Sequence, residues 1–370
     1  MKSPLSILYI TAFPPNQKTA GQDYSRRLLD DLVSRGHKIS LIYAEYPEHK
    51  IELSPEIKVL AKIKPAFKNC LSLPFFNPFF TKRFDKSILR QIQKIAANFD
   101  MLYFDFSQVH IYSLFVKHPN KVLMCHDVIC QKFSRKGKLF LPWIKSCEKK
   151  LLCSAEKIIT FSPKDCDVIK KEYGLDSTAV NFYLKNGRFD YEKSGIEKIE
   201  NKFCFYGAWN RAENSAGLEW FLENVYPNLS ASEDFQFAVI GGGMTEHLKS
   251  KISAYKNFKI LGFVENPVME IAKCQALVAP LFKGAGVKVK VIDALSSGTP
   301  VIGTEVAFEG IQDNSENPLF FEASTSEKKK LAQKFADILN NWKSISAKQK
   351  QSSADEFFER YNRNKFADLL

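Results

Sequence analysis

Residues 284–304 read GAGVKVKVIDALSSGTPVIGT, a stretch that runs from a glycine turn through a helix into an apolar strand. Gly284 and Gly286 allow the backbone to turn tightly and to approach a ligand closely. The helix that follows presents amide N–H groups and the positive end of its dipole, both of which favour an anion. Lys290 and Asp293 share one helix face, so a cation for phosphates lies beside a carboxylate that can accept hydrogen bonds from a ribose. The stretch therefore predicts a nucleoside diphosphate site.

The same stretch resembles the donor-site segment of GT-B glycosyltransferases, specifically the large retaining family 4. The resemblance lies in the glycine-rich turn, the lysine, the acidic residue with its following alanine, and the strand that begins after Gly298 and Pro300. Most members of the family carry a glutamate at the positions of Ala285 and Asp293, and this chain departs from them at both. Because Ala285 has no carboxylate, this chain must hold the sugar hydroxyls of the donor differently from most members of the family.

Apolar strands alternate with amphipathic helices along both halves of the chain, the pattern of parallel α/β sheets. Strands are predicted at residues 7–11, 39–44, 101–106, 122–125, 158–161 and 180–184, and again at 203–206, 235–240, 258–261, 276–281 and 300–303. The length of 370 residues suits two domains better than one core. We expect two facing, doubly wound Rossmann-like domains at residues 1–185 and 186–346. The resemblance implies that a last helix, about 347–370, crosses back to the N-terminal domain.

Composition and charge narrow the class of protein further. The chain is 45% hydrophobic and 25% charged, which is typical of globular domains. Its net charge of +12 favours anionic partners such as phosphorylated sugars, lipid headgroups or nucleic acid. No apolar run reaches the roughly 20 residues of a membrane-spanning helix. The eight cysteines form no CxxC pair, so reduced, buried thiols in a cytoplasmic protein are expected.

His126 directly follows the predicted strand 122–125, at the end of a parallel strand where ligands bind in such sheets. The resemblance implies that it contacts the donor sugar near the anomeric carbon. Asp127 has two open interpretations, since it can orient His126 through a ring nitrogen or cap the following turn. Gly21 lies in the loop after the first strand, which in the family approaches the donor diphosphate, and an ordinary strand-to-helix turn is the alternative.

The second half of the chain carries the remaining donor contacts that the resemblance implies. The arginine and lysine that most members place on the diphosphate are replaced here by Ala208 and Asn214. Arg211, between them, either supplies the missing charge or is a solvated loop residue. The predicted donor-binding residues are Gly21, Arg211, Val264, Gly286, Val287, Lys288, Lys290 and Asp293, and the predicted catalytic residues are His126, Lys290 and Asp127.

Neither a cofactor nor a metal ion is expected. Asp165 and Asp167 superficially match a metal-binding DxD motif, but Ser162 and Pro163 in front of them are typical of a helix N-terminus. The charge of a diphosphate is then balanced by lysine, arginine and helix amides alone.

The segment 73–86, LPFFNPFFTKRFDK, combines five phenylalanines with three basic residues. One interpretation is an acceptor wall or a loop that docks on an anionic inner membrane leaflet. The alternative is a loop folded under its own domain, where each buried ring contributes about 1.5–3 kcal/mol. The residues assigned to acceptor or membrane contact are Phe75, Phe76, Phe79, Lys82 and Arg83.

The sequence thus predicts a retaining glycosyltransferase that moves a sugar from a nucleoside-diphosphate sugar to a hydroxyl of a glycan or lipid-linked acceptor. Synthesis of bacterial surface polysaccharide or lipopolysaccharide is the expected setting. A nucleotide-sugar 2-epimerase shares the two-domain fold and is the alternative enzyme. A basic nucleic-acid-binding protein is disfavoured, because the charges are scattered and no RRM, KH or helix-turn-helix pattern is present.

Overall fold

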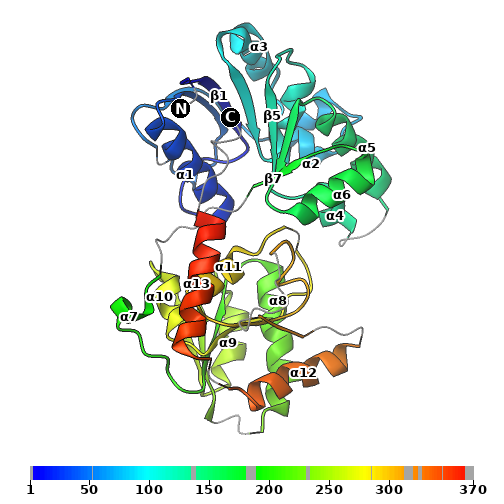
Figure 1. Ribbon diagram of the computed structural model, residues 1–370. Coiled ribbons are helices and arrows are strands. Elements are labelled where there is room, and N and C mark those ends of the chain that lie inside the picture. Colours follow the sequence, from blue (N-terminus) through cyan, green and yellow to red (C-terminus); the bar gives the residue numbers. More distant parts are fainter. Residues whose placement is uncertain are drawn as a thin grey trace. The chain divides into compact units, whose positions relative to one another are not determined.

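A computed structural model describes residues 3–51, 53–134, 139–180, 189–230, 234–284, 286–311, 320–323, 327–343 and 345–362. The chain divides into two compact units, the first running to residue 183 and the second from residue 184 to 363. Each unit is built on one sheet with helices on both faces, and the two units are described separately below (Figure 1).

Among the described residues the first sheet has seven parallel strands in the order β3-β2-β1-β4-β5-β6-β7. These strands are β1 (Ser6–Thr11), β2 (Lys38–Ala44), β3 (Lys58–Ile63), β4 (Met101–Asp105), β5 (Lys121–Cys125), β6 (Lys157–Thr160) and β7 (Thr178–Ala179). The edge strand β3 was not predicted, because it is exposed along much of its length and lacks the apolar run of its neighbours. Residues 181–184 of the predicted last strand lie outside the described residues.

The helices of the first unit begin and end at local signals in the sequence. They are α1 (Ala20–Ser34), η1 (Phe67–Ser72), α2 (Pro78–Thr81), α3 (Lys86–Ile95), η2 (Ala96–Asn98), η3 (Ser107–Leu114), α4 (Ile129–Ser134), α5 (Leu141–Leu152) and α6 (Pro163–Tyr173). In α1, Thr19 caps the first turn by accepting from the Gln22 amide, and Gly36 turns the chain at φ +85°. In α6, Ser162 accepts from the Asp165 amide, so this aspartate serves the helix start as predicted.

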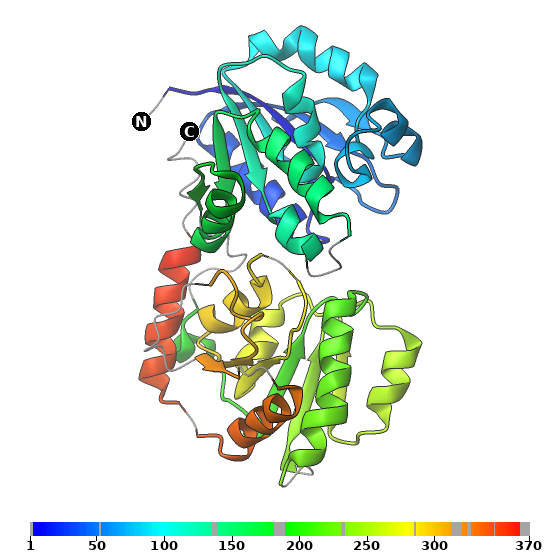
Figure 2. The same ribbon diagram turned by 90° about the vertical axis from the view of Figure 1, so that its right-hand side faces the viewer.

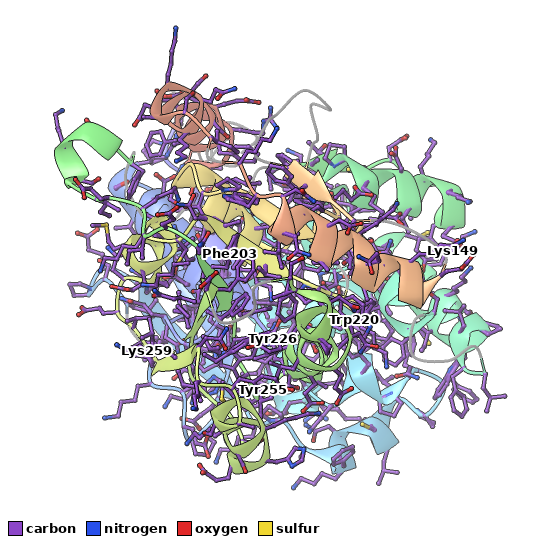
Figure 3. The ribbon with its side chains drawn as sticks, turned by 90° about the horizontal axis from the view of Figure 1, so that it is seen from below. Lys149, Phe203, Trp220, Tyr226, Tyr255 and Lys259 are labelled. Atoms are coloured by element: carbon purple, nitrogen blue, oxygen red, sulfur yellow. The ribbon has the colours of Figure 1, made fainter. Side chains whose placement is uncertain are left out.

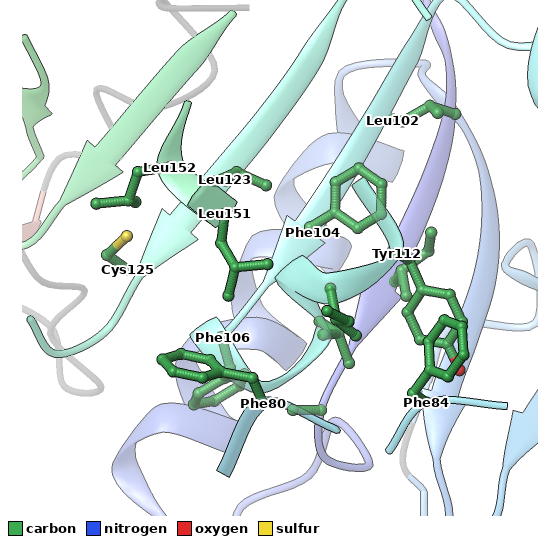
Figure 4. Close-up of a cluster of buried hydrophobic side chains, with 14 of the residues drawn as sticks. Phe80, Phe84, Leu102, Phe104, Phe106, Tyr112, Leu123, Cys125, Leu151 and Leu152 are labelled. Carbon is green, nitrogen blue, oxygen red and sulfur yellow. The ribbon is translucent and has the colours of Figure 1, made fainter. Parts of the chain in front are cut away.

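Most of the phenylalanine-rich segment belongs to the core of the first unit. Phe80 and Phe84 are buried in the same cluster as Phe104 and Tyr112, and the Phe84 ring lies next to that of Tyr112 (Figure 4). Phe76 and Phe79 are partly buried and pack against the same cluster. The alternative of a loop folded under its own domain is therefore right for these rings, because α2 lies across η3 and closes the core on that side.

In the described part of the second unit, six parallel strands follow the order β10-β9-β8-β11-β12-β13 (Figure 2). They are β8 (Lys202–Tyr206), β9 (Gln236–Ile240), β10 (Phe258–Gly262), β11 (Ala276–Ala279), β12 (Val301–Gly303) and β13 (Phe320–Glu322). The helices are α7 (Tyr191–Ser194), α8 (Ala212–Trp220), the π-helical turn η4 (Phe221–Val225), η5 (Tyr226–Asn228), α9 (Glu246–Ser253), α10 (Pro267–Ala272), α11 (Val289–Ser296), α12 (Lys328–Asn340) and α13 (Ala347–Asn362).

Aromatic side chains fill the core of the second unit. Phe203 on β8 is fully buried, and Trp220 and Tyr226 converge on the same layer (Figure 3). The Tyr226 and Tyr255 rings meet edge to face with centroids 4.9 Å apart, a favourable geometry for aromatic pairs. This rigid core supports the loops at the carboxyl end of the sheet.

The last helix, α13, begins at Ala347 as predicted, but its described residues pack against α11 of the second unit. Phe357 is fully buried and its ring lies 5.9 Å from the ring of Phe320 on β13. Phe357 of α13 therefore serves the second unit, whereas the sequence assigned the whole helix to the N-terminal domain. Residues 363–370 lie outside the described residues.

The cysteines are free thiols, and most are buried as expected. Cys70 and Cys166 are partly buried, and Cys153 is exposed at the end of α5 where the chain leaves the helix. No helix within the described ranges has the length and apolar character needed to cross a bilayer.

Candidate active site

The chain order of each sheet reverses between two central strands, β1 and β4 in the first sheet and β8 and β11 in the second. Ligands of doubly wound sheets bind outside the carboxyl ends of such strands. Thr11 and Asp105 end β1 and β4, and Tyr206 and Ala279 end β8 and β11. These two switch points are therefore the places at which to look for the predicted residues.

At the first switch point, a buried carboxylate holds His126. The Nε2 atom of His126 donates to Oδ1 of Asp105 over 2.7 Å. The second oxygen of Asp105 accepts from the hydroxyls of Ser25 and Thr11. Asp105 is fully buried, so these hydrogen bonds replace its hydration and fix its orientation. An ionised carboxylate only accepts, which keeps the proton on Nε2 and leaves Nδ1 for a ligand.

Aromatic rings and a glycine fix the plane of the His126 ring. Phe106 stacks on it with centroids 3.5 Å apart, and Tyr24 and Phe161 meet it edge on. A Cβ atom on Gly21 would come within 3.0 Å of the Phe106 ring and 3.2 Å of the histidine Nδ1. The structure thus places the predicted residues Gly21 and His126 side by side, and a side chain at position 21 would push the Phe106 ring and the imidazole by a few tenths of an ångström.

Asp127 does not orient His126. Its carboxylate instead accepts from Nζ of Lys132 over 2.6 Å. Asp105, which sequence reasoning missed, takes the orienting role because β4 and β5 are neighbours in the sheet and their ends coincide. The signal for Asp105 was a charged residue inside the apolar run 101–106, MLYFDF.

A second histidine lies near this cluster but serves the fold. His110 is buried and shares a hydrogen bond between Nε2 and the carbonyl oxygen of Met124. Burial lowers its pKa to about 4, so the ring is neutral at physiological pH. His126 is therefore the histidine of the two that is available to a substrate.

At the second switch point, backbone segments meet so closely that side chains are excluded. A Cβ atom on Gly241 would lie 2.0 Å from the carbonyl oxygen of Gly207, and one on Gly217 would lie 2.4 Å from that of Pro280. Gly286 has φ +71°, in the region that favours glycine. The loops after β8, β9 and β11 are thereby held together at the carboxyl end of the sheet.

Lys290 is the central cation of this site. Its Nζ donates to Oδ1 of Asn214 over 2.7 Å. Burial is the main cause that lowers its pKa to about 7, and the charges of Lys288 and Arg211 contribute to this shift against a partial offset from Glu213. Arg211 is exposed and close enough for its charge to act on Lys290, and its contact with a diphosphate stays a prediction. A bound anion would relieve this repulsion and restore the charge of Lys290.

Asn214 and Lys288 shape the same site. Nδ2 of Asn214 donates to the carbonyl oxygen of Ala208 over 2.8 Å, so the side chain links the loop after β8 to Lys290. Nζ of Lys288 donates to the carbonyl oxygen of Gly286 over 2.6 Å and lies 3.5 Å from a carboxylate oxygen of Glu309. The sequence identified Asn214 only as the place where a family lysine is missing, and the structure gives it a positioning role.

The remaining predicted donor residues surround the start of α11. This helix begins after Lys288 without a capping side chain, and the Val291 amide already donates to the Lys288 carbonyl, so the amides of Val289 and Lys290 are the ones placed for an anion. Asp293 lies one turn along α11, near enough to Tyr206 that burial and this carboxylate together raise the pKa of the tyrosine hydroxyl. Val287 is half-buried in the turn before α11, and Val264 is half-buried after β10. Both valines lie in loops that follow the carboxyl ends of strands, and their contact with a nucleotide stays a prediction.

In the part of the chain that the structure describes, no cluster of three His, Cys, Asp or Glu side chains is arranged to hold a metal ion. Asp165 accepts from the hydroxyl of Ser162 over 2.8 Å and thus belongs to the start of α6. The absence of a metal requirement stays a prediction.

Comparison with known proteins identifies the class that this fold and these sites define. The family model described as Glycosyltransferase Family 4 matches residues 22–181, and the model described as Glycosyl transferases group 1 matches residues 200–341. The two matches cover the first and the second unit in turn. The chain belongs to the GT-B glycosyltransferases of the family 4 type.

A curated relative and several solved structures are similar to this chain over most of its length. A protein described as an uncharacterized 44.6 kDa protein in the cps region of Klebsiella pneumoniae is 26% identical over 325 residues, covering 77% of this chain and 79% of the relative. The crystal structure of WaaG, a glycosyltransferase involved in lipopolysaccharide biosynthesis, has a TM-score of 0.64 at 13% identity and covers 98% of this chain and 97% of its own. A glycosyltransferase from Rickettsia africae has a TM-score of 0.67 at 14% identity, covering 100% of this chain and 98% of its own. Anabaena HepE in complex with UDP and glucose has a TM-score of 0.63 at 13% identity, covering 99% of each chain.

Proposed function

We propose that this glycosyltransferase moves a sugar from a nucleoside-diphosphate sugar to a hydroxyl of a glycan or lipid-linked acceptor, with retention of the anomeric configuration. The observation that carries the proposal is the environment of Lys290, whose pKa is lowered to about 7 by burial and by neighbouring cations. Burial and the neighbouring cations disfavour the charged form of this lysine, and a bound anion would stabilise that form. A diphosphate that gains negative charge as the sugar departs is the ligand that the site would stabilise most strongly.

In this proposal the second unit binds the nucleotide. Lys290, Lys288 and the first amides of α11 bind the diphosphate, and Arg211 adds charge from the loop before α8. Asp293 accepts hydrogen bonds from the ribose hydroxyls, and backbone groups near Val264 contact the base. Anabaena HepE, with the same fold, is described in complex with UDP, which supports a nucleoside diphosphate as donor group.

His126 acts on the transferred sugar. Asp105 holds the proton on Nε2, so Nδ1 can contact the sugar ring and stabilise charge near the anomeric carbon. The acceptor oxygen bonds to the anomeric carbon while the bond to the diphosphate breaks, and the proton of the acceptor passes to an oxygen of the departing diphosphate. No residue of the chain needs to form a covalent intermediate, and no metal or cofactor takes part.

We assign the reaction to the synthesis of bacterial surface polysaccharide. The support is the Klebsiella relative described from a cps region and the similarity of fold to a protein described as acting in lipopolysaccharide biosynthesis. Acceptors of such reactions are growing glycans, often linked to lipid, so a hydroxyl of a glycan is the group that receives the sugar.

A melting-temperature screen over UDP, GDP, ADP and TDP and their sugars tests the proposal first. A ligand at about one hundred times its dissociation constant stabilises the fold by about 2.7 kcal/mol, which is easily measured. The stabilising nucleotide sugar is then incubated with and without a membrane extract that contains acceptor. Transfer predicts that free nucleoside diphosphate is released only with acceptor present. Release without acceptor together with a changed sugar configuration would instead identify the 2-epimerase.

We further propose that the protein acts in the cytoplasm and docks reversibly on an anionic membrane leaflet through the first unit. Phe75 is 86% exposed and Phe140 is 61% exposed. The indole N–H of Trp143 donates to the carbonyl oxygen of Phe75 over 2.8 Å, which brings both segments to one surface. Further exposed apolar side chains of this unit are Phe67, Leu71 and Leu139. Exposed rings next to basic residues are typical of membrane-surface binding.

Basic side chains accompany these rings. Nζ of Lys82 lies 4.5 Å from the ring centre of Phe67, and Nζ of Lys150 lies 5.9 Å from that of Phe76, the neighbour of the exposed Phe75. Each lysine near an anionic bilayer contributes about 1 kcal/mol. Arg83 takes no part, because it is buried, and Phe76 and Phe79 pack against the core. These three residues therefore leave the membrane-facing part of the set that the sequence assigned to acceptor or membrane contact.

Vesicle co-sedimentation tests the docking surface. The double variant Phe75→Ser, Phe140→Ser is expected to keep the wild-type melting temperature and to lose binding to phosphatidylglycerol vesicles. Phe79→Ser is the matched control, since its ring contacts Phe80 and Phe133 and its loss is expected to lower the melting temperature. Unchanged vesicle binding of the double variant would rule out docking through this surface.

A further inference from the structure

Arg83 is a buried cation at the ligand-binding edge of the first sheet. It is only 9% exposed. Its Nε donates to the carbonyl oxygen of Ala12 over 3.0 Å, and Nη2 donates to the hydroxyl of Tyr46 over 2.5 Å. The guanidinium also lies 4.8 Å from the ring centre of Phe13. Ala12 and Phe13 follow β1, and Tyr46 follows β2, so the group lies where two parallel strands end.

No carboxylate lies within ion-pair distance of Arg83 among the residues that the structure describes. The nearby acidic residues are engaged elsewhere, because Glu45 pairs with Lys62 and Glu48 lies 3.9 Å from Lys18. Burial lowers the pKa of the guanidinium and raises that of the Tyr46 hydroxyl. A buried charge without a counter-charge is expensive to maintain. Arg83 therefore has the properties of a residue whose partner is a ligand.

Three donors of the guanidinium remain for that ligand. Arginine carries five N–H groups in a planar fork, and within the described ranges only the Nε–H and one N–H of Nη2 have a protein acceptor. A fork with free donors on both terminal nitrogens suits the oxygens of a phosphate or a carboxylate. N–H groups without a protein acceptor do not stabilise the fold, so an arginine that served only the fold would not need them.

The position of Arg83 connects it to the candidate active site. The Phe13 ring, over which Arg83 lies, meets the Phe106 ring edge to face with centroids 5.0 Å apart. Phe106 in turn stacks on His126. An oxyanion bound at Arg83 would thus be separated from His126 by the rings of Phe13 and Phe106.

We propose that Arg83, aided by the hydroxyl of Tyr46, binds an oxyanion carried by the acceptor. This inference rests on the proposed function, because it names the class of acceptor for that reaction. The oxyanion has two sources, a phosphate on a phosphorylated or lipid-linked sugar and the carboxylate of an acidic sugar. Both bring the counter-charge that Arg83 lacks, and both place the neighbouring hydroxyl of the acceptor at the carboxyl end of β1.

The test measures anion binding by the full chain with saturating nucleoside diphosphate, so that the site in the second unit is already filled. Inorganic phosphate and glucuronate are the two probes, and each is titrated by isothermal calorimetry. We expect one of them to bind the wild type, and Arg83→Gln to weaken that binding about tenfold or more, as for loss of a hydrogen bond to a charged group. Tighter binding of phosphate assigns the phosphorylated acceptor, and tighter binding of glucuronate assigns the acidic sugar.

Two further variants keep the test decisive. Lys86→Gln removes one positive charge from an exposed position three residues away and is expected to leave anion binding unchanged. Tyr46→Phe keeps the ring and is expected to weaken anion binding even if Arg83→Gln does not fold. Equal binding of both probes by wild type, Arg83→Gln and Tyr46→Phe would overturn the inference. A wild type that did not bind nucleoside diphosphate would instead contradict the proposed function. The anion titration would then still test whether Arg83 binds an oxyanion.

Discussion

The switch points of the two sheets carry opposite electrostatic arrangements. At the first, the fully buried carboxylate of Asp105 receives hydrogen bonds from His126, Ser25 and Thr11, so the charge is satisfied by the protein. At the second, Lys290 is bonded to a neutral amide and is destabilised by nearby cations. The protein itself satisfies the charge of Asp105 at the first switch point, whereas a bound anion would stabilise the charge of Lys290 at the second.

This difference separates two ways of preparing a site for group transfer. A satisfied network holds a side chain in one geometry before the substrate arrives, which is the requirement for acting on a developing charge. An unsatisfied cation gains its full interaction only when an anion binds, so it contributes most as charge grows on the departing diphosphate. Variants in the first site should therefore affect turnover, and variants in the second should affect binding.

The largest effect is expected for His126→Ala. Turnover should fall about one hundredfold or more, because the group that stabilises the sugar is removed, while nucleoside diphosphate binding stays near the wild-type value. Initial rates and calorimetry measure the two quantities. His247→Ala, at an exposed position on α9, is the matched control and should change neither. Normal turnover of His126→Ala would show that the first site takes no part in the reaction.

Asp293→Ala should produce the opposite pattern in the second site. Loss of a charged hydrogen bond to the ribose is expected to weaken nucleoside diphosphate binding by about 1.5–3 kcal/mol, or roughly ten- to one hundredfold in dissociation constant. Calorimetric titration measures the change. Glu305→Ala removes an exposed carboxylate from the same unit and should bind like the wild type. If both variants bound equally well, Asp293 would have no ribose contact.

Asp105→Asn tests whether the first site depends on orientation. An amide can donate as well as accept, so it no longer fixes the proton on Nε2 of His126, and turnover should fall about tenfold or more. Ser25→Ala, which removes one of the donors to Asp105, should have a smaller effect in the same direction. Nucleoside diphosphate binding should stay unchanged in both. A fall in binding with unchanged turnover would contradict the division of roles between the sites.

The smallest effect is a proton taken up when the nucleotide binds. The pKa of Lys290 is about 7 in the free protein, and a nearby diphosphate raises it. Binding should therefore be strongest below about pH 7 and weaken as the pH rises through the higher pKa of the complex. Calorimetry at pH 8 in HEPES and in Tris should reveal uptake of a fraction of a proton. Lys290→Arg should abolish this uptake, and equal uptake by both proteins would assign the proton to another group.

The sequence predicted the second site better than the first, for a physical reason. The turn, the helix start and the spacing of Lys290 and Asp293 are local features, so residues 284–304 contain most of what places them. The contact of His126 with Asp105 joins the ends of two neighbouring strands, and it follows only from the order of the sheet. Adjacency in sequence pointed to Asp127 instead, which pairs with Lys132.

The sequence also did not predict which residues of the phenylalanine-rich segment 73–86 are buried. Phe75 and Phe76 are adjacent, yet the first is exposed and the second packs against the core. Arg83 carries a charge that predicts the surface, but the folded segment places it beneath Phe13 and Tyr46. Composition predicted that rings and cations occur together here, and only tertiary packing decides which of them meet solvent.

The backbone of Phe106 has an evolutionary consequence. This residue has φ +70° and ψ 138°, a conformation that costs a side-chain-bearing residue about 1–3 kcal/mol. Its buried ring offsets that cost, since removal of a buried phenylalanine side chain destabilises a protein by about 3–5 kcal/mol. A smaller residue other than glycine would keep the backbone strain and lose the buried ring. Such a single substitution would therefore destabilise the protein. Lineages that replace Phe106 should therefore do so in pairs, with glycine at this position and a larger neighbour that fills the vacated space against His126.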